Sequence, residues 1–228
     1  MSTLASLVDG LAGLLQPLFG AGAAAAAIVL ITALVRFLVH PFSRAAVRGQ
    51  KAREALRPRI AELRRRHARD PERFQRAVLE LHRAERVSPL SGLLPGLCQL
   101  PAFFLLYHLF SSSSVGGQPN GLLAHRLFDA PLGGRWADAL ADGGLFGGAG
   151  LVYVALFACV AAVATFSWRR AAAAQRELPA QTPGVLAKGL PFLSFFTLVT
   201  VAVVPLAAAL YIATSTAWGV VERAVLYR

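Results

Sequence analysis

Charged side chains are scarce in this chain of 228 residues. Only 15% of the residues are Asp, Glu, Lys or Arg, whereas about a quarter are charged in a typical soluble domain. The deficit is uneven, because residues 41–89 hold fourteen of the 23 Lys and Arg residues. This distribution excludes an ordinary soluble domain, and it is typical of a multispan membrane protein with one basic excursion into water.

Motifs for covalent chemistry and metal binding are also lacking. Cys98 and Cys159 both lie in apolar runs without metal-ligand spacing, so we expect small buried hydrophobic residues there. The five histidines are scattered, and the chain has no phosphate loop, no H-E-x-x-H motif and no nucleophile elbow. We therefore expect no enzyme, no catalytic residue, no cofactor and no metal.

Long apolar stretches are what the chain has instead. A helix needs about 20 apolar residues to cross a hydrocarbon core of about 30 Å. We predict five transmembrane spans, at residues 21–40, 91–110, 149–167, 187–204 and 205–221. Pro41 is expected to end the first span, and Pro205 to divide the last apolar run into two antiparallel spans, because proline breaks the helix hydrogen-bond pattern. Both of these spans are short, which predicts local thinning of the bilayer.

The segments between the spans predict the orientation. They are an outer surface helix at 1–20, a cytoplasmic hairpin at 41–89, an outer loop at 111–148, a cytoplasmic loop at 168–186 and a cytoplasmic tail at 222–228. Together with Lys188 at the start of the fourth span, the inner segments carry 20 Arg and Lys residues and the outer loop carries two, and positive charge favours the cytoplasmic side. We expect a multi-pass protein of the bacterial cell membrane, with its N-terminus outside and its C-terminus inside.

Two outer segments are expected to lie at the membrane surface. The first 20 residues carry apolar side chains on one helical face, at Leu4, Leu7, Val8, Leu11, Leu14, Leu15 and Leu18. They predict an amphipathic interfacial helix. The basic start of a cleaved signal peptide is missing, and an uncleaved signal anchor is the alternative. A short interfacial helix is expected around Leu122–Phe128 of the outer loop.

Residues 43–87 predict two helices that form an antiparallel hairpin. Leu56, Ile60 and Leu63 recur at helical spacing, and Asp70-Pro71 is a strong start signal for the second helix. Fourteen basic and six acidic residues give the hairpin a net charge of +8. It is either a loop that rests on anionic lipid headgroups, or a docking arm for a ribosome, a targeting factor or a nascent chain. Direct binding of nucleic acid is not expected, because no nucleic-acid motif is present.

Arg36 is the most informative residue of the chain, because it lies inside the first predicted span. An arginine at mid-membrane costs roughly 2.5–3.5 kcal/mol. Its side chain either reaches the inner headgroups, about 6 Å away, or faces a hydrated surface within the bundle. Thr32, one turn earlier on the same face, favours the hydrated surface. Further polar residues at membrane depth are Gln99, Thr197, Thr200, Tyr211, Thr214 and Ser215. Each alone is more often a contact between helices, but together with Arg36 they could line one cavity.

Four stretches of the sequence occur in a recognisable order. They are Thr32–Arg36 leading into Pro41; Leu56–Ile60 with Asp70 and Leu81-His82; Val87-Ser88-Pro89 continuing through Gln99 to Tyr107; and Pro205–Tyr211 with Thr214-Ser215. In this order the chain resembles the YidC/Oxa family of membrane-protein insertases, over nearly its whole length. The third stretch is the most specific, because nothing generic requires its spacing of prolines, glycine and glutamine.

The resemblance implies an all-α integral membrane protein. Its five transmembrane helices would surround a hydrophilic groove that opens to the cytoplasm and to lipid. The residues it places in that groove are Arg36, Thr32, Gln99, Phe103 and Tyr211. Thr200 and Ser215 join them as polar residues at membrane depth. The chain departs from the family at Leu198–Ala202, where phenylalanines are usual, at Ser88, where asparagine is usual, and in having no long basic tail after Arg228.

The resulting hypothesis is a membrane-protein insertase and chaperone that passes polar segments of small membrane proteins through the groove. Expected partners are nascent membrane-protein substrates and anionic lipid headgroups; a ribosome or targeting factor at residues 43–87 and a Sec translocon are further candidates. Two other classes remain open. A small transporter would bind an anionic solute at Arg36, although no internal repeat supports it. A membrane-anchored scaffold would use the basic hairpin to recruit partners.

Overall fold

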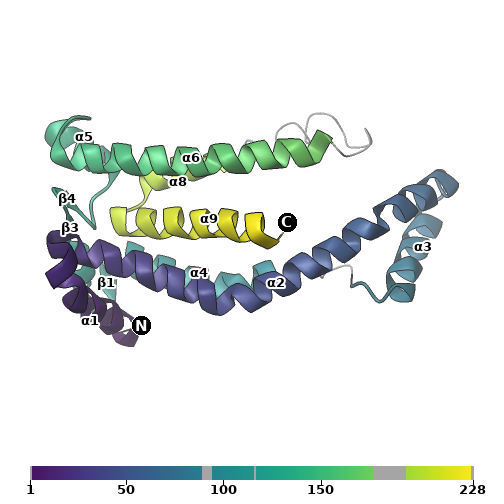
Figure 1. The fold of residues 1–228 in the computed structure, drawn as a ribbon, viewed down its shortest axis with the longest axis horizontal. Helices are drawn as coiled ribbons and strands as arrows, with labels where there is room; N and C mark the ends of the chain where they lie inside the picture. The colour runs from purple at the N-terminus through teal and green to yellow at the C-terminus, as the bar shows by residue number, and fades with distance from the viewer. Residues whose placement is uncertain (1, 89–93, 116, 177–193, 227–228) are drawn as a thin grey trace. The chain divides into compact units, whose positions relative to one another are not determined.

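The structure, a computed structural model, describes residues 2–88, 94–115, 117–176 and 194–226 (Figure 1). The described chain is mostly helical, as predicted. It divides into two compact units: the first comprises residues up to Arg36 together with Phe104–Val225, and the second comprises Phe37–Phe103 with the last three residues. Parts of the predicted segments 41–89, 91–110, 168–186 and 187–204 lie outside the described residues.

The chain begins with helix α1 (Ser2–Phe19), which the 3-10 turn η1 (Gly20–Gly22) joins to the next helix. Gly20 has a φ of 51°, in the left-handed region that only glycine enters at little cost. Val8 of α1 is fully buried, whereas Leu7, Leu14 and Leu18 are 64%, 77% and 79% exposed. A helix therefore forms where the sequence predicts one, and it leaves an uncovered stripe of leucines. Its place on the membrane surface stays a prediction.

Helix α2 (Ala23–Arg66) runs for 44 residues and includes both Pro41 and Pro58. The prediction that Pro41 ends this helix was wrong. A proline inside a helix removes one backbone hydrogen bond and costs about 3 kcal/mol, but a long helix retains the bonds on either side. The first predicted span and the first arm of the predicted hairpin are consequently one continuous helix.

The predicted hairpin forms in the second unit, where α3 (Pro71–Ala84) follows the end of α2. Asp70 caps α3, because its Oδ1 accepts a hydrogen bond of 3.0 Å from the backbone N–H of Arg73. Arg59 and Glu85 form an ion pair between the two arms. Leu56 is buried, and Leu63 of α2 and Leu81 of α3 line one hollow, so the apolar spacing in the sequence identified the packed face correctly.

The first unit also contains α6 (Gly148–Arg176), α8 (Phe196–Val203), α9 (Leu206–Leu226) and the end of α4 (Leu94–Ser111). Pro205 separates α8 from α9, as predicted. Alanines occupy much of the interior, which lets the helices approach closely. Buried residues of this core include Ala27, Ile28, Leu109, Phe110, Leu156, Val160, Ala164, Val201, Leu206, Ala207, Ala208 and Ala209.

The predicted outer loop contains two small antiparallel ladders, β1 (Ser114–Val115) with β2 (Gln118–Pro119) and β3 (Arg126–Leu127) with β4 (Ala130–Pro131). The helix expected around Leu122–Phe128 was wrong in extent, because only a 3-10 turn, η2 (Gly121–Ala124), forms there before the chain turns into β3. A further helix, α5 (Trp136–Gly143), packs against α6.

This loop also caps α9. The backbone N–H groups of Leu206 and Ala207 donate hydrogen bonds of 2.9 Å each to the carbonyl oxygens of Gly134 and Leu132. The first N–H groups of a helix have no partner within the helix itself. The loop carbonyls supply that partner, and they fix the start of α9 against the loop.

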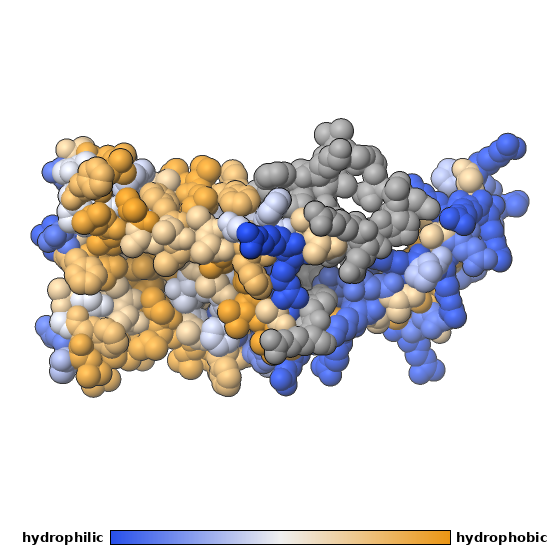
Figure 2. Space-filling model, turned by 45° about the horizontal axis from the view of Figure 1, so that its top comes forward, coloured by the Kyte–Doolittle hydropathy of each residue, from blue (hydrophilic) through white to orange (hydrophobic). Residues whose placement is uncertain are grey.

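Two helical stretches of the described chain are long and apolar enough to cross a membrane, Ser6–Arg66 and Gly148–Ala173; Leu100–Ser111 is a shorter apolar helix. Apolar side chains cover most of the face of the first unit that Figure 2 shows. Leu34, Phe104 and Val199 are each more than half exposed. Such a surface fits contact with lipid, while the number of five spans stays a prediction.

Candidate functional site

Arg36 and Ser215 join α2 to α9 inside the first unit. The Nε and one Nη of Arg36 donate hydrogen bonds of 2.8 and 2.5 Å to the hydroxyl oxygen of Ser215. Ser215 is only 5% exposed, and Arg36 is half-buried. The guanidinium therefore points at another helix of the same unit, which agrees with the bundle-facing interpretation of this residue.

The positive charge of Arg36 is not neutralised by an ion pair with any described residue. A guanidinium carries five N–H donors, and Ser215 occupies two of them. Within the described part of the chain, the other three have no acceptor. Against the described residues, Arg36 therefore has donors to spare, and Glu222 of α9 is the acidic group within electrostatic range of it.

Tyr211 lies one turn before Ser215 on α9 and completes this polar group. Its side chain lies within interaction range of Ser215 and Arg36, and it is only 1% exposed. The ring lies 5.9 Å from that of Phe110 on α4, with 51° between the ring planes. The structure thus brings three of the seven predicted site residues together, namely Arg36, Tyr211 and Ser215.

Thr32 and Thr200 each bond to their own helix. The hydroxyl of Thr32 donates to the carbonyl oxygen of Ile28 at 2.7 Å, and its side chain is fully buried. The hydroxyl of Thr200 donates to the carbonyl oxygen of Phe196 at 3.2 Å. Such bonds satisfy the hydroxyl proton locally. These bonds do not join either threonine to the Arg36 group, and both stay predicted groove residues.

Gln99 and Phe103 lie on the part of α4 that belongs to the second unit. Phe103 is half-buried there, and the side chain of Gln99 lies outside the described residues. Their membership of a groove with Arg36 stays a prediction.

Two residues of α9 near this group were missed in the sequence. Trp218 and Glu222 follow Tyr211 by seven and eleven residues, which places them on the same helical face. Glu222 lies within electrostatic range of Arg36. The indole Nε1 of Trp218 is buried and has no partner among the described residues. Their helical spacing from Tyr211 was the signal in the sequence that could have identified them. Helical spacing alone, however, does not show which neighbouring helix that face of α9 contacts.

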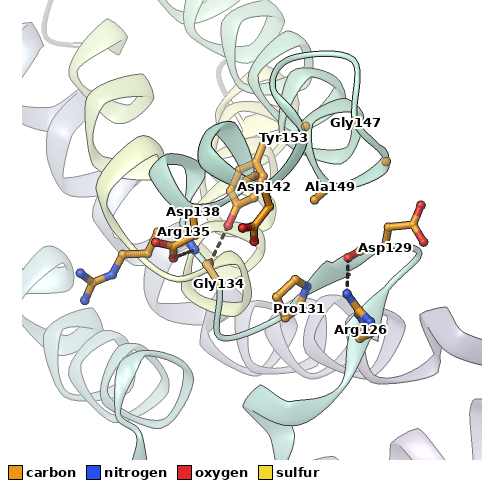
Figure 3. Close-up of a pocket in the computed structure, with 14 residues that line it drawn as sticks. Arg126, Asp129, Pro131, Gly134, Arg135, Asp138, Asp142, Gly147, Ala149 and Tyr153 are labelled. Carbon is orange, nitrogen blue, oxygen red and sulfur yellow. Dashed lines mark hydrogen bonds between the residues drawn. The ribbon is translucent and has the colours of Figure 1, made fainter.

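A second candidate is a cavity of about 280 Å³ in the first unit, which Figure 3 shows beside α5 and the start of α6. Three of its polar side chains, those of Tyr153, Asp138 and Arg126, bond to the local backbone. The hydroxyl of Tyr153 donates to the carbonyl oxygen of Gly134 at 2.6 Å, and Asp138 Oδ2 accepts from the backbone N–H of Arg135 at 2.9 Å. Arg126 likewise donates to the carbonyl oxygen of Asp129 at 2.9 Å. This cavity therefore belongs to the construction of the loop.

Metal chemistry has no visible basis in the described residues, which contain no group of His, Cys, Asp or Glu able to hold a metal ion. Among those same residues, the polar group around Arg36 is the one that combines burial at a predicted membrane depth with a charged side chain whose hydrogen-bond partner is neutral. It is the candidate functional site.

Comparison with known proteins gives one family for nearly the whole chain. Residues 14–228 match the model of a family described as 60Kd inner membrane protein. Proteins named membrane protein insertase YidC are similar over shorter stretches. The one from Clostridium perfringens is 36% identical over 95 residues, which are 41% of this chain and 40% of that protein.

Two longer relatives carry the same name. The protein of Laribacter hongkongensis is 41% identical over 81 residues, which are 36% of this chain and 15% of the relative. The protein of Geobacter sulfurreducens is 35% identical over 81 residues, again 36% of this chain and 15% of the relative. The chain thus spans less than half the length of each of these relatives.

Proposed function

Since this chain belongs to the 60Kd inner membrane protein family, the family of the YidC/Oxa-type insertases, we propose that it inserts small membrane proteins into the bilayer. It would pass their polar segments through a hydrated groove and release their apolar helices sideways into lipid. The observation that carries the proposal is the half-buried Arg36, which bonds to the neutral hydroxyl of Ser215.

The charge of Arg36 explains why such a site would act on polar segments. A charge at membrane depth is expensive, and proteins retain one there mainly for function. A carboxylate paired directly with Arg36 would have neutralised it, whereas its hydrogen-bond partner is a serine hydroxyl and Glu222 interacts with it only electrostatically. An acidic side chain on an incoming segment is therefore attracted to this depth of the bundle.

Insertion needs no covalent step. An unsatisfied backbone group costs several kcal/mol in hydrocarbon, and a wet groove shortens the dry distance that a polar segment has to cross. The favourable free energy comes from the apolar helix of the substrate as it enters lipid. No nucleotide is then required.

We also propose that the bilayer thins around the two short spans predicted at residues 187–204 and 205–221. Thinning would shorten the dry distance further.

The basic hairpin provides a docking surface in this proposal. In the described hairpin, Arg66 and Arg76 form ion pairs within their own helices, with Glu62 at 2.6 Å and Glu72 at 3.7 Å. Exposed arginines such as Arg57 and Arg64 form no ion pair with described residues. Anionic lipid headgroups, a ribosome or a targeting factor fit this charge, and a Sec translocon is a further proposed partner.

The test is rescue of bacterial cells depleted of their own insertase. Expression of this chain should restore growth and the insertion of a small protein with an acidic translocated tail, measured by protection of the tail from added protease. Failure to insert any such client, despite normal amounts of the protein in the membrane, would refute the proposal. Flux of a small anion through proteoliposomes without any protein client would support a transporter instead.

A further inference from the structure

Two phenylalanines of the predicted outer loop are left uncovered by the rest of the first unit. Phe146 is 89% exposed and Phe128 is 77% exposed. Among the described residues, no large apolar side chain is more exposed than Phe146. A ring surrounded by water forgoes the favourable free energy of burial. These two rings, called the aromatic tips below, are therefore unfavourable wherever water surrounds them.

The backbone at Phe128 is also unfavourable. Leu127 pairs with Ala130, so Phe128 and Asp129 form the two-residue turn between β3 and β4. Phe128 has a φ of 51°, whereas glycine, asparagine and aspartate dominate turns with a positive φ at this position. For a bulky residue such a φ is an outlier, and local strain of this kind is concentrated at functional sites. Phe128 is thus disfavoured by both its backbone and its exposure, which indicates a partner outside the chain.

The aromatic tips lie in neighbouring turns. A Cβ at Gly148 would clash with the carboxylate of Asp129, so this carboxylate lies against the backbone of Gly148. Asp129 follows Phe128 directly, and Gly148 begins α6 two residues after Phe146. The turn between β3 and β4 therefore lies beside the turn that precedes α6, and both rings belong to one end of the first unit.

The apolar surface beside the aromatic tips continues onto a helix that can cross a membrane. The stretch Gly148–Ala173 of α6 is long and apolar enough to do so, and Leu151 and Val154 in its first turns are 53% and 42% exposed. Arg126, in β3 next to the tips, is exposed as well. At a membrane interface, aromatic rings contact acyl chains and arginines reach the phosphates. Lipid is therefore the partner that fits a surface joining exposed rings, an arginine and a predicted span.

We propose that Phe128 and Phe146 anchor the outer loop in the membrane interface, with both rings below the phosphates of the leaflet that the loop faces and Arg126 at the phosphates. Apolar side chains of interfacial segments are buried about 5–10 Å into the boundary between headgroups and acyl chains, and the rings should reach this depth. The anchor goes beyond the proposed insertion activity and does not depend on it. Because the same loop supplies the carbonyls that hold the start of α9, the anchor also relates that helix to the level of the bilayer.

The experiment measures the depth of each aromatic tip in a bilayer. The full chain with Cys98→Ala and Cys159→Ala carries one new cysteine at a time, Phe128→Cys or Phe146→Cys, labelled with bimane. The vesicles contain phosphatidylethanolamine and phosphatidylglycerol, and the quenchers are a spin label on the upper acyl chain and iodide equilibrated across the membrane. The matched control is Gln118→Cys, an exposed polar position in β2 of the same loop. The lipid spin label should quench both tip probes roughly threefold more strongly than the control probe, and iodide should quench in the opposite order.

Two results would overturn the proposal. Iodide quenching of the tip probes as strong as that of the control would place the rings in water. Shielding of the tip probes from both quenchers would place them against protein, such as a second copy of this chain or another membrane protein, and not in lipid.

A second pair of variants tests the ring of Phe128 without a label on it. Phe128→Asn removes the ring but keeps a residue that tolerates the positive φ, whereas Phe128→Trp keeps an aromatic side chain suited to the interface. With the probe at Phe146→Cys, the Asn variant should lower quenching by the lipid spin label about twofold, because apolar anchoring area is lost, and the Trp variant should retain it. Equal quenching in the two variants would contradict joint anchoring. No client protein is used, so failure of the anchor and failure of the proposed insertion activity are distinguishable.

Discussion

Substitution of Arg36 tests the electrostatic basis of the site most directly. The hydrogen bonds of Arg36 to Ser215 place its charge inside the first unit. A hydrogen bond between charged groups is worth about 1.5–3 kcal/mol net. If that interaction forms in the rate-limiting state, Arg36→Ala should slow insertion of a client with an acidic tail by roughly 10- to 150-fold.

The assay is protease protection of the tail after insertion into proteoliposomes, with acidic and neutral tails compared side by side. Arg36→Lys should keep most of the rate on the acidic client, because it keeps the charge. Ser215→Ala is the structural control: it removes the neutral acceptor but not the charge, so it should lower stability while preserving the preference for acidic tails. An Arg36→Ala protein that inserts both clients at wild-type rates would refute the reasoning.

Three predictions concern stability, each measured as a change in melting temperature or hydrogen exchange. Asp70→Ala should destabilise α3 by about 1 kcal/mol through loss of its cap, visible as faster exchange in α3; unchanged exchange there would contradict it. Gly150→Ala should destabilise the protein strongly, since a Cβ there would clash with the carbonyl oxygen of Gly144, whereas Gly143→Ala meets nothing within 4 Å and is the control. Gly20→Ala should lower the free energy of unfolding by about 1–2 kcal/mol, because Gly20 has a positive φ. Gly10→Ala, in the open face of α1, should instead raise it by about 0.5–1 kcal/mol. Equal effects of Gly150→Ala and Gly143→Ala, or of Gly20→Ala and Gly10→Ala, would contradict the stated causes.

Local signals in the sequence predicted much of the fold. The cap at Asp70, the division at Pro205 and the helix over the first residues all depend on neighbours within one or two turns. The course of α2 through Pro41 did not follow from such signals, because the preference of proline is outweighed by the rest of a 44-residue helix.

The candidate site was predicted less completely than the fold. Arg36, Tyr211 and Ser215 were identified as polar residues at membrane depth, but the partner of Arg36 is 179 residues away in the chain. Thr32 was chosen for its position one turn from Arg36, and the structure shows its hydroxyl bonded to Ile28. Helical spacing indicates which residues share a face, and it does not indicate which face meets which helix.

The two hydrogen bonds from Leu206 and Ala207 to the loop carbonyls have a consequence for the Arg36 site. α9 cannot slide along its own axis without giving up both bonds, so the height at which Ser215 meets Arg36 is determined nine residues away, by the loop that precedes α6. A change in the length of that loop around Leu132 and Gly134 would move the meeting point up or down the bundle. The loop around Leu132 and Gly134 thus sets the depth in the bundle at which the charge of Arg36 lies, although the loop itself contributes no residue to the site.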